Sequence, residues 1–147
     1  MKSSISTLAF AALVAIASLA QGHAQTLATR VNVPFAFNCG SKHFAPGAYT
    51  LRRHDFGSQE LLTLWDGKSI SQFLINIGDA PRNTAQGYVI FRKYGDRYFL
   101  AEYHSANSTE TMQVPRSKME RNLARDYAAN RPQPERVQVG LNEGAGH

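Results

Sequence analysis

The sequence contains a single cysteine, Cys39, among 147 residues, and this excludes an internal disulfide framework and any metal cluster held only by cysteines. Charged residues make up only 18% of the chain against 43% hydrophobic residues, so the composition is not that of a wholly disordered protein. The 11 glycines and 6 prolines follow no period, which excludes collagen-like and low-complexity classes. What remains fits one globular domain.

Several enzyme motifs are also missing. The chain has no Gly-x-Ser-x-Gly elbow, no His-Glu-x-x-His, no glycine-rich phosphate loop and no Cys-x-x-Cys. The chain has 16 lysines and arginines against 11 aspartates and glutamates. The basic residues are not clustered in the way that is typical of nucleic-acid binding. The sequence therefore predicts neither a cofactor nor a nucleic-acid partner, and it favours a protein that is not an enzyme.

Residues 1–24 have the pattern of a secretory signal peptide. Lys2 is followed by 13 mostly apolar residues at 8–20, and Gly22-His23-Ala24 places small residues where cleavage between Ala24 and Gln25 requires them. The apolar run is shorter than the roughly 20 residues that a membrane-spanning helix needs. We expect an exported protein, periplasmic or extracellular, that is not an integral membrane protein after cleavage.

Alternation of apolar and polar residues predicts a mainly β fold after the leader. The clearest run is 31–37, where Pro34 lacks a backbone N–H and therefore favours an edge strand or a bulge. Six further strands are predicted over residues 48–53, 60–65, 68–76, 88–93, 98–104 and 111–114.

Two of the turns between these strands predict hairpins. Asp66-Gly67 suits a hairpin loop, and both a two-residue and a three-residue loop remain open, with different side chains on the core face. Gly95-Asp96 predicts a two-residue loop for the second hairpin. The cross-strand pairs that follow are Phe91 with Leu100 and Tyr88 with Tyr103.

A helix is predicted to follow the strands. Ser117 and Glu120 form a capping-box pattern, and Met119, Leu123 and Tyr127 recur on one helical face up to about residue 129. We expect this face to pack on the sheet, with a partner-binding or membrane-surface helix as the alternative. The predicted fold is a small antiparallel barrel or sandwich of about six or seven strands with one C-terminal α-helix over residues 25–129, followed by a flexible tail at 130–147.

Four segments share a further pattern: Val-Asn-Val-Pro-Phe-Ala-Phe at 31–37, Phe-Ala-Pro-Gly-Ala-Tyr-Thr-Leu at 44–51, Phe-Arg-Lys-Tyr-Gly-Asp-Arg-Tyr-Phe-Leu at 91–100, and Pro-x-Ser-x-x-Glu at 115–120. Over residues 31–125 the chain resembles a group of small exported bacterial β-rich proteins of uncharacterised function. It departs from that group at Ala45-Pro46-Gly47, where proline and alanine are exchanged. The resemblance implies export and a β-rich fold and carries no catalytic residue across.

Glu102 and His104 are the strongest candidates for chemistry. They lie two residues apart on a predicted strand, so both side chains point to one face. A carboxylate beside an imidazole can hold a metal or transfer a proton, although a closed metal site needs a third ligand such as His43 or His54. A solvated ion pair is the favoured interpretation. For Cys39 we expect a small, partly buried side chain and not a nucleophile.

Aromatic residues on the two hairpins are the candidates for binding. Both faces of the strands carry them, so some must face outward, where a ring can stack on a sugar, a lipid or a partner side chain. The predicted ligand-binding residues are Trp65, Tyr88, Tyr98 and Tyr103, with ordinary core packing as the alternative.

Three functions follow from these patterns. The favoured one is a non-enzymatic binding or interaction module for an envelope protein, a glycan or an apolar ligand. The alternative is a metal-dependent or hydrolytic periplasmic enzyme that uses Glu102 and His104. The third is a surface-active or assembly subunit that joins another chain through the helix or the strand at 31–37.

Overall fold

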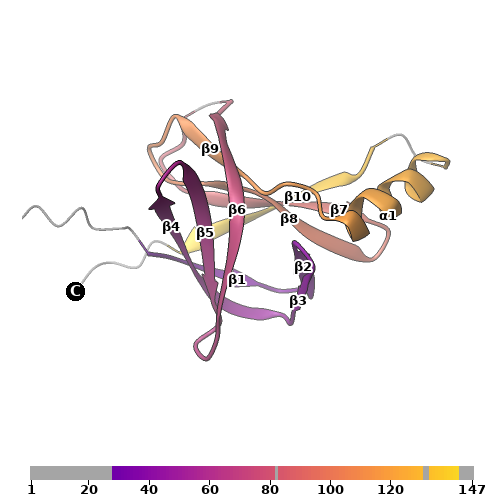
Figure 1. The fold of residues 1–147 in the computed structure, drawn as a ribbon, viewed down its shortest axis with the longest axis horizontal. Coiled ribbons are helices and arrows are strands. Elements are labelled where there is room, and N and C mark those ends of the chain that lie inside the picture. Colours follow the sequence, from indigo (N-terminus) through magenta and orange to yellow (C-terminus); the bar gives the residue numbers. More distant parts are fainter. Residues whose placement is uncertain (1–27, 82, 131–132, 143–147) are drawn as a thin grey trace, which may run out of the picture.

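The computed structural model describes residues 28–81, 83–130 and 133–142, so the predicted leader and its cleavage site lie outside the described residues. The described part contains ten strands and one helix (Figure 1). They are β1 (Thr29–Val33), β2 (Phe37–Cys39), β3 (Lys42–Phe44), β4 (Gly47–Phe56), β5 (Gln59–Trp65), β6 (Ile70–Asp79), β7 (Tyr88–Tyr94), β8 (Arg97–His104), β9 (Glu110–Gln113), α1 (Lys118–Ala128) and β10 (Glu135–Asn142).

Eight of the strands close into an antiparallel barrel. Their order is β1-β4-β5-β6-β9-β8-β7-β10, and β10 returns to β1. The short strand β9 completes the ring, because Gln113 pairs with Asn76 of β6 on one side and with Glu102 of β8 on the other. Closure removes the unpaired edges that an open sheet would expose. The mainly β fold with a barrel and one helix is thereby confirmed, while the predicted count of six or seven strands is too low.

One reason for the low count is the segment at 31–37, which is not one strand. The chain leaves the barrel wall after Val33, at the proline that cannot donate to a ladder, and then forms the β2–β3 hairpin. This hairpin joins β8 through the parallel pair of Asn38 with Phe99. Between the two parts, Phe35 stacks on Tyr98 with ring centroids 3.9 Å apart.

The second reason is β10, which forms where a flexible tail was expected at 130–147. Residues 135–142 pair with β7 along six residues and with β1 at Leu141 and Asn142. Val137 and Val139 pack against the core and Leu141 is buried in it. The prediction was therefore wrong for this segment, because the Val-x-Val-x-Leu alternation is short and lies among proline, glutamine and glycine. Residues 143–147 lie outside the described part.

The β7–β8 hairpin confirms one predicted pair and corrects the other. Gly95 has a φ of 63° in the turn, and Phe91 faces Leu100 as predicted. Beyond that pair a β-bulge shifts the register, so Tyr88 faces His104 and not Tyr103.

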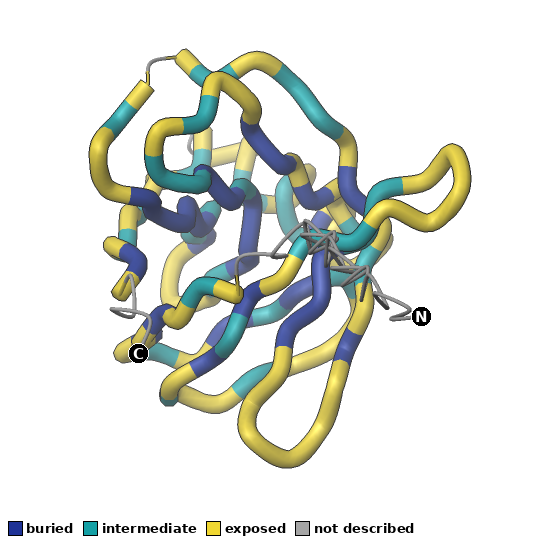
Figure 2. The backbone as a smooth tube through the Cα atoms, turned by 90° about the vertical axis from the view of Figure 1, so that its left-hand side faces the viewer, coloured by how far each residue is buried: buried dark blue, intermediate teal, exposed yellow. Residues whose placement is uncertain are grey.

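Buried positions recur along the barrel strands (Figure 2). Large apolar side chains at these positions form the core of the barrel. The cavity among them measures about 10 Å³ and is lined by Val31, Val33, Phe37, Tyr49, Leu51, Leu64, Val89, Phe91 and Leu100. That volume is at the lower limit for one water molecule, so these residues leave no room for an apolar ligand. Cys39 is also buried in this core, and burial raises the pKa of its thiol far above the ordinary value.

Helix α1 begins at the predicted cap, but its predicted apolar face is not the part that is most deeply buried against the barrel. Ser117 Oγ accepts a hydrogen bond from the Glu120 backbone N at 3.1 Å. The helix residue that is fully buried is Glu120, whereas Met119 is exposed and Leu123 and Tyr127 are half-buried. The apolar face therefore packs only in part, through contacts such as the Tyr127 ring edge against Tyr94. Among the described residues, no helix has both the length and the apolar character needed to span a bilayer.

Candidate functional site

The four aromatic residues predicted to bind a ligand do not come together. Tyr88 is buried and stacks on His104 with centroids 4.3 Å apart. Tyr103 lies in the core, with its hydroxyl 3.1 Å from Thr29 Oγ1. Tyr98 lies near the β7–β8 turn. Of these four residues only Trp65 is exposed, at 43%, and it faces outward from β5.

Trp65 belongs to a groove on the outer wall of the barrel. The groove encloses about 320 Å³ and spans three adjacent strands. We call it the outer groove, and its residues are Thr50, Arg52, His54, Thr63, Trp65, Ile70 and Gln72. The strand register explains the set, because Thr50 pairs with Trp65 and Trp65 with Ile70 in one row. Alternate residues of the same strands, such as Leu51 and Leu64, face the core.

The β5–β6 turn positions Trp65 and Ile70 at one end of the groove. Its loop has four residues, 66–69, which differs from both lengths that the sequence left open. The Asp66 carboxylate accepts hydrogen bonds from the backbone N of Ser69 and of Lys68, at 2.7 and 2.8 Å. These bonds lower the pKa of Asp66. The loop sets the register in which Trp65 and Ile70 lie side by side on the outer face.

Thr63 lies in the middle row of the groove, between Arg52 and Gln72. It is only 7% exposed, and its hydroxyl is buried without a hydrogen-bond partner among the described residues. A buried polar group without a partner costs about 1–3 kcal/mol. A ligand in the groove that hydrogen-bonds to Thr63 would remove that cost.

Further apolar surface continues along the outer wall from Trp65. Ile70 is 65% exposed, and Leu74 of the same strand is also exposed. Leu74 faces the half-buried Leu61 across the strand pair. Sequence reasoning identified Trp65 but missed its neighbours, although the period-two spacing of Ile70, Gln72 and Leu74 shows that they share a face.

The structure does bring Glu102 and His104 together, in a buried network. His104 Nε2 lies 2.9 Å from Glu102 Oε2, and Nδ1 lies 3.1 Å from Thr111 Oγ1. Burial raises the pKa of Glu102, but hydrogen bonds from His104 and Arg136 outweigh it and hold the pKa below its ordinary value. Because an ionised carboxylate only accepts, His104 Nε2 is the donor of the hydrogen bond to Glu102.

This network leaves no open coordination position on His104. Both ring nitrogens have partners, and the ring lies under Tyr88. Of the two candidate third ligands, His43 contacts Asn38 and His54 lines the outer groove. The described residues contain no group of three His, Cys, Asp or Glu side chains positioned for a metal. The pair therefore connects β8 to β9 and, through Arg136, to β10.

A second concave region lies where β4 meets the loop after β8, with a volume of about 580 Å³ and Arg53 in its lining. Arg53 donates to Glu60 at 2.9 Å and to Glu110 at 2.8 Å. The bond from Arg53 lowers the pKa of Glu60, and the hydrogen bond with Glu60 raises the pKa of Asp55. The arginine at this end of the barrel is thus already paired with carboxylates of the protein itself.

No protein-family model matches this sequence, and neither a curated protein nor a solved structure matches it at a significant level. The resemblance to small exported bacterial proteins stays a prediction from the four segments.

Proposed function

We propose that this protein is an exported, non-enzymatic binding module that holds a saccharide in the outer groove. The observation that carries the proposal is the exposed indole of Trp65 beside the buried, unpartnered hydroxyl of Thr63. Export rests on the leader pattern at 1–24. The filled interior favours recognition on the outer wall over enclosure of an apolar ligand.

The composition of the groove favours a saccharide over a protein partner. Apart from Trp65 itself, five of the six lining residues carry hydrogen-bonding side chains, and they surround the indole ring. A sugar offers C–H groups that pack on an aromatic face and hydroxyls that both donate and accept, which suits Trp65 and Thr63 together. Protein–protein interfaces are also enriched in tryptophan and arginine, so the preference for a saccharide depends on the number of hydrogen-bonding side chains around the indole.

The single tryptophan makes the groove directly observable. Because Trp65 is the only one in the chain, its fluorescence reports on the groove alone. We expect a saturable change in emission when the protein is titrated with at least one of three probes: cello-, chito- or malto-oligosaccharides. Replacing Trp65 with alanine should weaken binding by about thirtyfold, the effect of losing an anchor worth roughly 2 kcal/mol, as measured by calorimetry.

Phe56→Ala is the matched control, since Phe56 is an exposed aromatic residue outside the groove. This variant should bind the oligosaccharides as tightly as the unmodified protein does. A second variant, Thr63→Val, should bind more weakly because it removes the hydroxyl and keeps the shape. Absence of saturable binding for all three oligosaccharide series would contradict the proposal, as would undiminished binding by Trp65→Ala.

A further inference from the structure

A separate concavity lies between α1 and the outer face of β7 and β10, on a different part of the barrel from the outer groove. It has a volume of about 360 Å³. Its charged lining consists of three arginines, Arg92, Arg116 and Arg136, and Tyr94 and Tyr127 form part of its wall. We call it the arginine pocket.

The positions of these arginines are unusual for a barrel wall. Arg92 and Arg136 lie directly opposite each other on β7 and β10, so their side chains share one face. Like charges in that arrangement destabilise a sheet unless something compensates them. Two carboxylates do so in part: Glu120 lies 2.5 Å from Arg92, and Glu102 lies 2.9 Å from Arg136.

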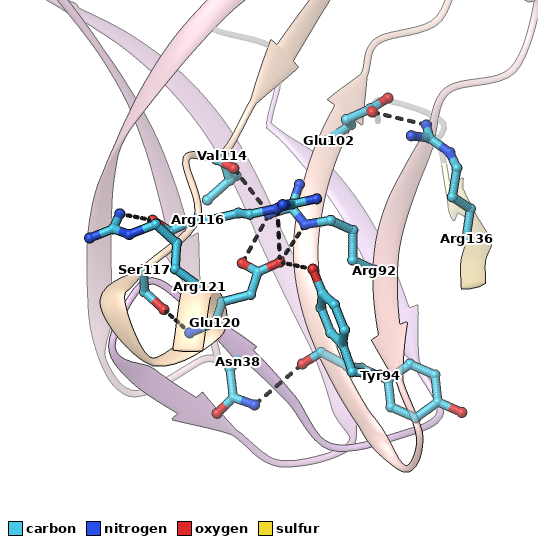
Figure 3. Close-up of polar contacts among 11 residues, drawn as sticks. Asn38, Arg92, Tyr94, Glu102, Val114, Arg116, Ser117, Glu120, Arg121 and Arg136 are labelled. Carbon is cyan, nitrogen blue, oxygen red and sulfur yellow. Dashed lines mark hydrogen bonds and ion pairs between the residues drawn. The ribbon is translucent and has the colours of Figure 1, made fainter. Parts of the chain in front are cut away.

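Arg116 adds a third positive charge without adding a carboxylate. Its Nε lies 3.9 Å from the same Glu120 oxygen that already accepts from Arg92. Figure 3 shows the guanidinium groups of both residues close to the carboxylate of Glu120. Three guanidinium groups thus meet two carboxylates, and one positive charge remains uncompensated within this set.

Two of the three arginines of the pocket are accessible to a ligand. Arg116 is 48% exposed and Arg136 is 59% exposed, whereas Arg92 is mostly covered. Arg116 precedes the helix and Arg136 lies on β10, so their donors approach the pocket from two directions. Guanidinium groups bind oxyanions through paired N–H donors, and donors from several directions suit a tetrahedral group better than a planar carboxylate.

We infer that the arginine pocket binds a phosphoryl group, carried either by a soluble phosphorylated compound or by a lipid headgroup. Arg116 and Arg136 donate to its oxygens, and Arg92 stays paired with Glu120 behind them. Half-buried Tyr127 and the small side chain of Ala124 provide an apolar wall for the organic part of the ligand. This site is independent of the saccharide proposal, because none of its residues lines the outer groove.

Calorimetric titration at constant ionic strength tests the inference. The probes are inorganic phosphate and phenyl phosphate, with acetate as the planar comparison. We expect both phosphates to bind saturably and more tightly than acetate, and both Arg116→Gln and Arg136→Gln to weaken phosphate binding by about fivefold or more. Arg125→Gln is the matched control, since it removes the same charge from α1 at an exposed position outside the pocket and should leave binding unchanged.

Vesicles distinguish the two sources of the phosphoryl group. Binding to phosphatidylglycerol vesicles above the level for phosphatidylcholine, lost in both arginine variants, supports a headgroup. Binding of phenyl phosphate without preference between the vesicles supports a soluble compound. The inference is overturned if neither phosphate nor vesicles bind, if acetate binds as tightly as phosphate, or if all three arginine variants lose binding equally. Saccharide binding monitored at Trp65 should be unaffected by these substitutions, so each proposal can fail without the other.

Discussion

Replacing Glu120 with glutamine is expected to lower the free energy of unfolding by about 3 kcal/mol, the effect of breaking a buried ion pair. The Glu120 side chain is 2% exposed and accepts hydrogen bonds from Arg92 and from the Tyr94 hydroxyl. The variant leaves the mostly covered guanidinium of Arg92 without its closest counter-charge. Urea unfolding measures the loss directly, and thermal unfolding should show a midpoint lower by roughly 10 °C.

Glu135→Gln is the control for this prediction. It makes the same chemical change in an ion pair with Lys93, but Glu135 is largely exposed. Solvent weakens such pairs, so we expect no measurable change in the unfolding midpoint. Equal midpoints for the two variants would contradict the view that Glu120 anchors α1 to the barrel.

A chain that ends at Asn130 is expected to lose cooperative folding. This truncation removes β10 and leaves β1 and β7 with unpaired edges where the barrel was closed. It also removes Leu141 from the core, a loss worth about 2–4 kcal/mol by itself against the 5–15 kcal/mol that stabilises a typical domain. Circular dichroism during thermal unfolding should show no sharp transition, and size-exclusion chromatography should show aggregation.

The matched control is a chain that ends at Asn142. It keeps β10 whole, and its unfolding midpoint should match that of the full chain. If the chain ending at Asn130 unfolds at the same temperature as this control, β10 does not close the barrel.

Local patterns predicted much of the fold because they depend on neighbours in the chain. The Gly95-Asp96 loop and the Ser117 cap both lie within a few residues of the groups that they contact. Two features that depend on distant residues were missed. The bulge moves Tyr88 opposite His104, and Glu120, expected as part of a capping box, instead contacts Arg92 on a strand 28 residues earlier.

The candidate site was predictable only at Trp65. Arg52, Thr63 and Gln72 lie on three strands, and they meet because the β4–β5 and β5–β6 registers align them in one row. The β5–β6 register depends on the loop in which Asp66 accepts from Ser69. An Asp-x-x-Ser turn pattern in the sequence could have indicated that loop, but the burial of Thr63 follows only from the assembled wall.

Acrylamide quenching of Trp65 emission tests most directly whether ligand is held on the outer wall of a filled barrel. In the free protein we predict efficient quenching, because the indole is exposed on β5. A saturating oligosaccharide should reduce the quenching constant by about twofold or more, because it covers the ring in a groove of three strands. A shielded tryptophan in the free protein, or a quenching constant that bound saccharide leaves unchanged, would contradict this account.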